Sequence, residues 1–426
     1  MVSYRLDNMA ITIDKQGASS FRKASFPVRF GTYSEIKTFE YEFQFNLKGE
    51  IKFIRGLNVD WPHPSESLKR TDGNDWVFYS VGTVTGLKGV REWLGEYYLP
   101  CLPYASNSLV EFNPFSDATI LKAFAAWSQL YAGLYGIANR PAPAEVKAFT
   151  DLILHNHENA LYEKSQKLHT IIGGRLSVLP PDTRHVDYEV IPLIIADGCL
   201  YHCDFCSVKS DQRFKPRSKR NILEQISQLK TFYGPNLQNF KALFLGNHDA
   251  LGAGNERIIL AATEAVKVFG LGHAHLNKNP LLFLFGSVDA FLKNVDELLA
   301  ELNASPFYTY INIGLESVDG PTLQKINKPL KVSRIHDAFQ KMLVVNRDYG
   351  NIEITANFLL GEQLSPQHYG SITELLQSVP DSLCGKGAIY LSPLMDSRKR
   401  PGLLQPFYKI KNASRLPVFI YLIQRL

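Results

Sequence analysis

Short apolar runs alternate with amphipathic stretches over residues 190–391, and no other feature constrains the fold of this 426-residue chain as strongly. The apolar runs predict strands over residues 190–195, 241–246, 281–285, 308–315, 352–360 and 388–391. Between the runs, apolar residues recur with the period of a helix, which predicts helices over residues 221–232, 256–269, 288–302, 332–346 and 368–379. Strands that alternate with helices predict an α/β fold, a parallel (βα)6-type partial TIM barrel.

The residues before the barrel have a different pattern. Apolar and polar side chains alternate over residues 40–54 on both sides of a turn at 46–49, which predicts an antiparallel hairpin. Helices are predicted over residues 118–135 and 144–165. Because Pro180 and Pro181 stop regular structure, we place a domain boundary beside them. We therefore predict a smaller α+β domain of unknown role over residues 1–182, the barrel over 183–396, and a carboxyl-terminal extension over 397–426, whose apolar end is a packed helix or strand.

Three cysteines, Cys199, Cys203 and Cys206, follow the first predicted strand with the spacing CxxxCxxC. Functional loops of a parallel barrel follow the carboxyl ends of its strands, so a site is expected at this place. Thiolates are soft ligands that suit iron–sulfur clusters or zinc. Three of them on one loop can hold three irons of a [4Fe-4S] cube and leave the fourth iron open for a substrate.

The cysteine spacing, the aromatic Phe205 before the last cysteine and the preceding strand resemble the signature loop of the radical SAM superfamily. The resemblance implies that the open iron chelates the amino and carboxylate groups of S-adenosylmethionine (SAM). It also implies reductive cleavage of SAM to a 5'-deoxyadenosyl radical, which abstracts a hydrogen atom from an unidentified substrate. A ferredoxin or a flavodoxin is then the electron donor, and the cluster makes the protein oxygen-sensitive.

Later loops carry further residues that resemble the family. Gly246 and Asp249 match a turn and an acidic residue that hold the methionyl amino group of SAM. Glu316 and Ser317 lie in a Gly-Leu-Glu-Ser segment, which is expected to face the barrel mouth and to suit the ribose hydroxyls or the methionyl amine. Residues 354–361 resemble the strand that cradles adenine. The resemblance thus gives Phe205, Gly246, Asp249, Glu316 and Ser317 as cofactor-binding residues and the three cysteines as metal ligands, and it identifies no catalytic residue.

Several of these residues also have a purely structural interpretation. Asp249, Ser317 and Asp319 are of the types that commonly cap helices and turns. A basic run at residues 213–220 is of the kind that is usually solvated, although Arg217 and Lys209 are candidates to neutralise an anionic group of the substrate. His155 and His157 are two positions apart, so on a helix they point to different sides and are expected to be exposed polar surface.

Composition excludes several other classes. Hydrophobic residues make up 45% of the chain and charged residues 20%, as in ordinary globular proteins. A net charge of +5 is too small for a chain of this length to indicate nucleic-acid binding. Residues 1–15 mix charges with short apolar stretches, so we expect no signal peptide, no membrane span and a cytoplasmic protein. Three of the five cysteines form the motif above, and Cys101 and Cys384 stand alone. This distribution indicates a metal site at the motif and not a disulfide framework.

Two functions of other classes stay open at this point. An iron–sulfur electron-transfer protein would use the same cysteines to hold a cluster, without any SAM chemistry. A zinc-stabilised binding protein would use them to hold zinc, which normally takes four protein ligands in a structural site. His202, inside the same short loop, is a candidate for the fourth ligand.

Overall fold

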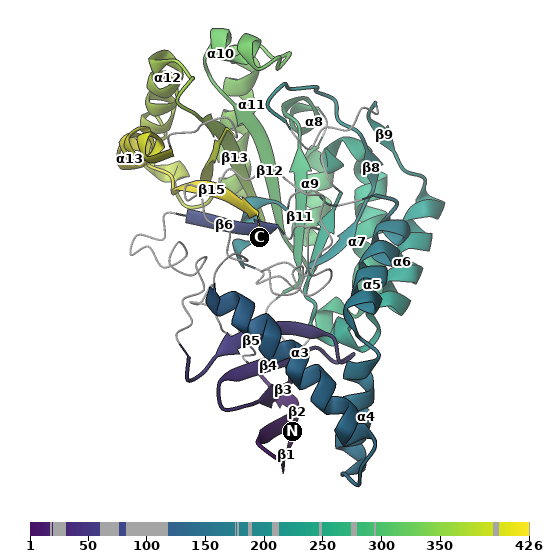
Figure 1. Cartoon of the computed structure of the whole chain (residues 1–426). Coiled ribbons are helices and arrows are strands. Elements are labelled where there is room, and N and C mark those ends of the chain that lie inside the picture. Colours follow the sequence, from purple (N-terminus) through teal and green to yellow (C-terminus); the bar gives the residue numbers. More distant parts are fainter. Residues whose placement is uncertain are drawn as a thin grey trace.

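The computed structural model of the chain has two parts, a parallel α/β sheet with its helices and a smaller antiparallel sheet with three helices (Figure 1). The residues that the structure describes are 1–17, 19, 31–59, 76–81, 118–174, 176, 179–185, 190–206, 213–246, 249–273, 279–293, 295–394 and 400–425. None of the helices in these ranges is both long enough and apolar enough to span a bilayer.

The larger sheet has eight described strands, and every neighbouring pair is parallel. In spatial order they are β6 (Trp76–Val81), β15 (Val418–Arg425), β14 (Ile389–Pro393), β13 (Ile352–Leu360), β12 (Tyr308–Glu316), β11 (Leu281–Gly286), β10 (Ala242–Leu245) and β7 (Val190–Leu193). All six predicted strands are present and adjacent in chain order, which confirms the predicted α/β fold with a parallel sheet. Short strands such as β7 and β10 are buried along their whole length, which is why they are continuous apolar runs in the sequence.

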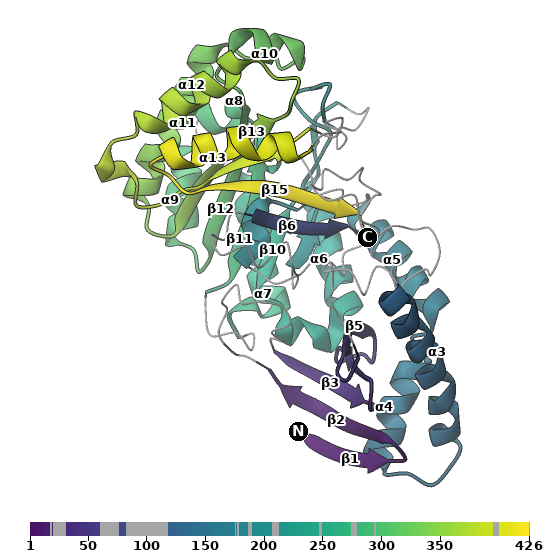
Figure 2. The same cartoon turned by 60° about the vertical axis from the view of Figure 1, so that its left-hand side comes forward.

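Two further strands extend the sheet at one side. β15 comes from the predicted carboxyl-terminal extension and pairs with β14, and β6 comes from the amino-terminal region and pairs with β15. Figure 2 shows these two strands side by side next to the barrel. The apolar residues near the carboxyl terminus therefore form a strand, one of the two alternatives predicted for them. The domain boundaries themselves stay a prediction.

A buried carboxylate ties the segment before β7 to the inside of the barrel. Asp182, in the short helix η2 (Pro181–His185), is fully buried and accepts hydrogen bonds from Thr355 of β13 (3.0 Å) and Tyr390 of β14 (2.8 Å). Because buried carboxylates are costly unless they are hydrogen-bonded, these two donors fix η2 against the sheet.

Helices pack on the outer face of the parallel sheet (Figure 1). They are α6 (Lys219–Tyr233), α7 (Asn255–Phe269), α8 (Val288–Leu292), α9 (Asp296–Ala304), α11 (Val332–Asp348), α12 (Pro366–Gln377) and α13 (Leu404–Ala413), whereas α10 (Gly320–Lys325) lies beyond the carboxyl end of β12. The single helix predicted over residues 288–302 is wrong, because Lys293 has an extended backbone that ends α8. Asp296 and Glu297 then begin α9, as acidic residues favour a helix amino terminus.

The amino-terminal part is an antiparallel sheet covered by helices. Its strands are β1 (Val2–Leu6), β2 (Met9–Gln16), β3 (Thr32–Lys37), β4 (Tyr41–Phe45) and β5 (Ile51–Gly56), in that order, and its helices are α3 (Ala118–Ala138), α4 (Ala144–Leu154) and α5 (Glu158–Ile172). The predicted hairpin is β4–β5, with Gly49 in the left-handed region at φ +73°. Trp127 of α3 packs against Phe43 and Phe45 in a separate apolar core.

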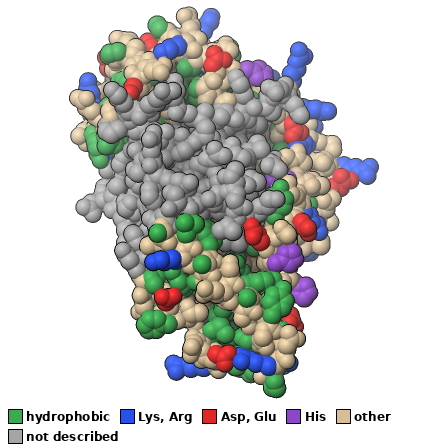
Figure 3. All heavy atoms as spheres, viewed as in Figure 1, with side chains coloured by type: hydrophobic (Ala, Val, Ile, Leu, Met, Phe, Trp, Pro, Cys, Tyr) green, Lys and Arg blue, Asp and Glu red, His purple; other side chains and the backbone are tan. Residues whose placement is uncertain are grey.

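The helix predicted over residues 144–165 is also wrong, because the chain turns between α4 and α5. Asn156 is buried at this corner and donates hydrogen bonds to the carbonyls of Lys48 (2.7 Å) and Leu152 (2.6 Å). His157 caps α5 by accepting a hydrogen bond from the amide of Ala160, and both His155 and His157 are exposed, as predicted. Figure 3 shows that apolar side chains also reach the surface in this part of the molecule, and α3 leaves Leu121 and Tyr135 half exposed.

Buried amides join the two parts. Asn239, at the end of the turn η3 (Gly234–Asn239) after α6, accepts a hydrogen bond from the amide of Thr32 and donates one to its carbonyl, both at 2.8 Å. Asn236 accepts a hydrogen bond from the amide of Leu47 (3.0 Å), and Lys48 donates one to the carbonyl of Phe232 (2.7 Å). The hairpin tip therefore docks on the amino-terminal edge of the parallel sheet, where α6 leads into β10.

We predict that Asn239→Ala lowers the free energy of unfolding by about 3 kcal/mol, because two buried backbone groups lose their partner and each costs roughly 1–3 kcal/mol. Chemical denaturation monitored by circular dichroism measures this change. Asn139→Ala is the matched control, because Asn139 is exposed at the end of α3, and a change within about 0.5 kcal/mol is expected there. Equal effects of the two substitutions would contradict the docking role of Asn239.

Candidate functional site

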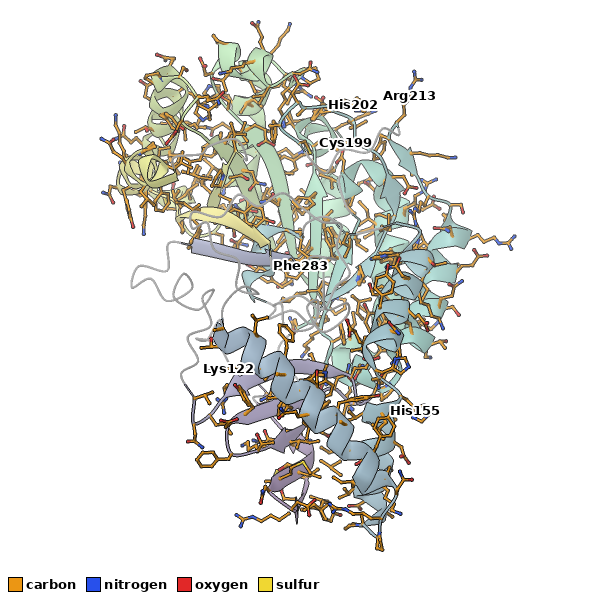
Figure 4. All side chains as sticks on the ribbon, viewed as in Figure 1. Lys122, His155, Cys199, His202, Arg213 and Phe283 are labelled. Atoms are coloured by element: carbon orange, nitrogen blue, oxygen red, sulfur yellow. The ribbon has the colours of Figure 1, made fainter. Side chains whose placement is uncertain are left out.

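The parallel register brings the carboxyl ends of the strands to one edge of the sheet, and the cysteine loop lies there. Cys199 follows β7 and the short strand β8 (Ala196–Asp197), which pairs with β9 (Lys215–Pro216). Figure 4 shows Cys199 and His202 at the end of the barrel that is remote from His155 and Lys122 of the amino-terminal part. The site and the domain junction thus occupy opposite ends of the sheet.

The three cysteines are free thiols on one turn. Cys203 is buried, Cys199 and Cys206 are half-buried, and the amide of Cys206 donates a hydrogen bond to the carbonyl of Cys203 (3.1 Å). Burial raises the pKa of Cys203 to about 12 and also raises that of Cys199. In the described ranges, no three His, Cys, Asp or Glu side chains converge closely enough to hold a single metal ion. A cube does not need such convergence, because each thiolate binds its own iron, so the donor set fits a cluster.

A turn after α10 holds the cysteine loop in place. The amide of Asp204 donates a hydrogen bond to the carbonyl of Ile326 (3.0 Å), and the side-chain amide of Asn327 donates one to the carbonyl of His202 (3.3 Å). Asn327 is in the left-handed region at φ +53°, a conformation that asparagine tolerates better than most residues. The Ile-Asn-Lys segment therefore forms one wall of the site.

Asp249 lies on the neighbouring loop after β10. Gly246 begins this loop at φ +93°, and its amide donates a hydrogen bond to the carbonyl of Leu193 (2.8 Å). Oδ1 of Asp249 accepts hydrogen bonds from the amides of Ser287 (2.8 Å) and Gly252 (3.3 Å), so the aspartate also caps the turn η4 (Ala250–Ala253). Its other oxygen, Oδ2, is buried and has no hydrogen-bond partner among the residues that the structure describes. Two neighbours of Asp249 in the sequence, Asn247 and His248, lie outside the described residues.

Burial dominates the electrostatics of Asp249. The side chain is 3% exposed, and this burial raises the pKa of its carboxyl group. Hydrogen bonds from Ser287 and Gly252 and the positive charge of Lys328 oppose the rise only in part. A buried carboxylate oxygen without a donor is a place where a cationic or hydrogen-bonding ligand binds favourably.

Glu316 and Lys328 form a buried pair at the end of β12. Lys328 Nζ donates a hydrogen bond to the carbonyl of Gly314 (2.8 Å) and lies 3.3 Å from Oε1 of Glu316. Glu316 is in the left-handed region at φ +66°, where the register between β12 and β13 shifts. Such backbone strain persists only where the surroundings fix it, and it is common at functional sites. The strained turn directs the carboxylate back over the strand toward the ammonium.

Ser317 is placed differently from Glu316. It is fully buried, and its hydroxyl lies 2.8 Å from Nδ1 of His368 and accepts a hydrogen bond from the amide of Asp319 (3.0 Å). Asp319 in turn caps α10 by accepting a hydrogen bond from the amide of Thr322. The capping interpretation is therefore confirmed for Asp319, whereas a cofactor contact of Ser317 stays a prediction.

The remaining predicted residues lie around this site. Phe205 is half-buried and packs against the core of the barrel. Arg217 is not available to a substrate anion as proposed, because its guanidinium binds Asp197 (2.5 and 2.9 Å) and the carbonyls of Ile172 and Gly173 at the end of α5. Lys209 lies outside the described residues.

The sequence reasoning missed Lys328, Tyr201 and Asp289. Lys328 lies in the turn after α10, and nothing in the sequence indicated that its side chain is buried and faces Glu316. Tyr201 lies inside the cysteine loop itself and donates a hydrogen bond to Asp289 (2.6 Å). The one signal in the sequence was the position of Tyr201, a residue with a hydrogen-bonding hydroxyl, between two of the cysteines.

Part of the chain matches a known family. Residues 193–368 match the family model of the radical SAM superfamily. Among solved structures, similar chains include a cobalamin-dependent S-adenosylmethionine radical enzyme, OxsB (18% identity, 54% of this chain and 31% of that chain covered, TM-score 0.35). A radical SAM methyltransferase from Sphaerobacter thermophilus (11% identity, 55% and 66% covered, TM-score 0.37) and methylornithine synthase PylB (10%, 62% and 81%, TM-score 0.33) are also similar.

These similarities are distant. The alignment covers 31% of the length of OxsB, and no curated protein matches the chain. The family match implies a [4Fe-4S] cluster and SAM as cofactors, and a need for an electron donor.

We predict that Cys203→Ser loses most of the iron and sulfide that the reconstituted protein binds, because a hydroxyl is a poor replacement for a thiolate at iron. Iron and sulfide assays after anaerobic reconstitution measure the loss. Cys384→Ser is the matched control, since Cys384 is half-buried and bonds only weakly to the carbonyl of Pro380 (3.4 Å). Equal metal content in the two variants would contradict the assignment of the cysteine loop.

We also predict that Asp249→Asn stabilises the metal-free protein at pH 7. The raised pKa means that the folded state binds the proton more tightly than the unfolded state, so ionisation of Asp249 costs stability as the pH rises from about 4. The asparagine variant lacks this cost. Thermal unfolding between pH 4 and 7 should show a higher Tm for the variant at pH 7 and a difference that closes toward pH 4. A wild-type Tm above that of the variant at pH 7 would contradict the prediction.

Proposed function

Because the chain belongs to the radical SAM superfamily, we propose that it binds a [4Fe-4S] cluster through Cys199, Cys203 and Cys206 and cleaves SAM for radical chemistry. When bound, the cluster supplies one electron to the sulfonium of SAM, and the resulting 5'-deoxyadenosyl radical abstracts a hydrogen atom from an unidentified substrate. The cysteine loop leaves one corner of the cube without a protein thiolate, as a SAM-chelating cluster requires.

The unpaired oxygen of Asp249 carries this proposal. Oδ2 is buried, has no donor among the described residues, and belongs to a carboxyl group whose charge, in addition to burial, raises the pKa of the Cys199 thiol. The ammonium group of the methionyl moiety would supply the missing charge and hydrogen bond. An ion pair in a site that excludes water is stronger than one at the surface, so this contact would orient SAM firmly.

Lys328 and Glu316 extend the proposed cofactor site. The Lys328 ammonium lies 5.2 Å from the ring centre of Tyr201 in the cysteine loop, and its charge opposes the rise in the pKa of both Cys203 and Asp249. We propose that Lys328 binds the methionyl carboxylate of SAM, so that this carboxylate and Glu316 would share one ammonium group. Glu316 then remains available to accept hydrogen bonds from the ribose hydroxyls. Gly246 allows the backbone to approach SAM closely, and Phe205 packs beside the cluster loop.

The proposed reaction also sets conditions for the protein. A low-potential carrier, a ferredoxin or a flavodoxin, would reduce the cluster. We place the enzyme in the cytoplasm, where thiols stay reduced before the cluster is assembled. The barrel would keep the radical away from solvent and so prevent side reactions.

Product analysis tests the proposal. The protein is reconstituted with iron and sulfide without oxygen, then mixed with dithionite and SAM, and chromatography measures 5'-deoxyadenosine and methionine. We expect both products from the wild type, and SAM binding weakened at least about tenfold in Asp249→Asn, since a charged hydrogen bond is lost.

Asp151→Asn is the matched control, because Asp151 is exposed on α4 in the amino-terminal part, and it should behave as the wild type does. A cluster that forms but yields no 5'-deoxyadenosine would favour simple electron transfer. A colourless preparation that holds zinc would favour a zinc-stabilised binding protein. Either result would overturn the proposal.

A further inference from the structure

The corner between β11 and α8 contacts two different loops of the proposed site. The amide of Ser287 donates a hydrogen bond to Oδ1 of Asp249 (2.8 Å), and two residues later the amide of Asp289 donates one to the hydroxyl of Tyr201 (3.2 Å). Tyr201 returns a hydrogen bond from its hydroxyl to Oδ2 of Asp289 (2.6 Å). One short backbone segment therefore holds both the loop of Asp249 and the loop of the cysteines.

Tyr201 is well placed to transmit a movement of this corner to the cluster. It lies between Cys199 and Cys203 in the chain and is 8% exposed. Its amide faces the sulfur of Cys199 (3.4 Å), and Nζ of Lys328 lies 5.2 Å from the centre of its ring. The backbone amide, the ring and the hydroxyl of Tyr201 thus each have a partner, which are Cys199, Lys328 and Asp289.

Asp289 is itself held from a third element. Arg334 of α11 donates a hydrogen bond to Oδ1 of Asp289 (3.0 Å). Burial tends to raise the pKa of Asp289, but the hydrogen bonds from Tyr201 and Arg334 and the charge of Arg334 outweigh it and lower the pKa. The carboxylate is therefore ionised at neutral pH and is a strong acceptor for the tyrosine.

We propose that Tyr201 and Asp289 are positioning residues that couple the cysteine loop to the SAM-binding loop through the corner at Ser287. The inference rests on the proposed function of the site and goes beyond it, since neither residue contacts SAM in that proposal. Ser287 and Asp289 lie two residues apart at the rigid start of α8. A shift of Asp249 on binding a ligand moves this corner, and the corner moves Tyr201 and the cysteines with it.

Hydrogen exchange of the full-length, metal-free chain tests the coupling without any cofactor. Tyr201→Phe removes the hydroxyl and keeps the ring over Lys328. We expect faster exchange in residues 200–206 and also at the amides of Gly252 and Ser287, which Tyr201 does not contact. Tyr308→Phe is the matched control, because Tyr308 donates a hydrogen bond to a carboxylate, Glu353 (3.4 Å), at the amino end of β12. Faster exchange that is confined to residues 200–206 would overturn the coupling.

A second measurement uses the reconstituted protein. The readout is the change that SAM produces in the electron paramagnetic resonance spectrum of the reduced cluster. We expect Tyr201→Phe to need about tenfold more SAM for this change than the wild type needs. The variant should bind as much iron as the wild type and keep a similar kcat. Asp289→Asn keeps an acceptor for the tyrosine, so the SAM concentration that it needs should lie between those of the wild type and Tyr201→Phe. Equal SAM dependence of Tyr201→Phe and wild type would overturn the inference. A wild type that gives no response to SAM would instead overturn the proposed function, and the hydrogen exchange would still report on the coupling.

Discussion

The parallel pairing of the sheet is the constraint on which the site depends. Because every neighbouring strand pair runs in the same direction, the loops after β8, β10, β11 and β12 meet at a single edge. Residues far apart in the chain, such as Asp204 and Ile326, become neighbours only through this geometry. An antiparallel strand anywhere between β7 and β12 would send one of these loops to the opposite edge.

Two locally unfavourable features are the second property of this edge. The buried Oδ2 of Asp249 has no partner among the described residues, and Glu316 adopts a backbone conformation that is unfavourable for a residue with a side chain. Both features cost folding free energy. The cost is tolerable because the strands beneath are buried and apolar along most of their length, and a ligand of the right charge would return part of it.

How far the sequence predicts this structure depends on the kind of contact. The six barrel strands were predictable because strands buried on both faces are continuous apolar runs, and the cysteine loop was predictable from its spacing. The breaks at Lys293 and Asn156 were not, because the apolar period continues across them. At Asn156 a tertiary hydrogen bond to the carbonyl of Lys48 fixes the turn, and at Lys293 the backbone is extended. The partners of Lys328 and Arg217 were equally hidden, since a basic side chain in a sequence does not indicate which carbonyl or carboxylate it meets in the fold. Strand β6 was missed because its only described partner in the sheet, β15, lies near the other end of the chain.

That position of β6 bears on how the molecule forms. Trp76–Val81 is synthesised before strands β7 to β14, yet its pairing partner Val418–Arg425 is synthesised after all of them. While β7 to β14 are made, the earlier strand has to wait for this partner, and a strand without its partner can pair with the wrong neighbour. The barrel strands from β7 to β14 can assemble in order as they appear, so closure of the β6–β15 pair is a late, long-range step in the maturation of this protein.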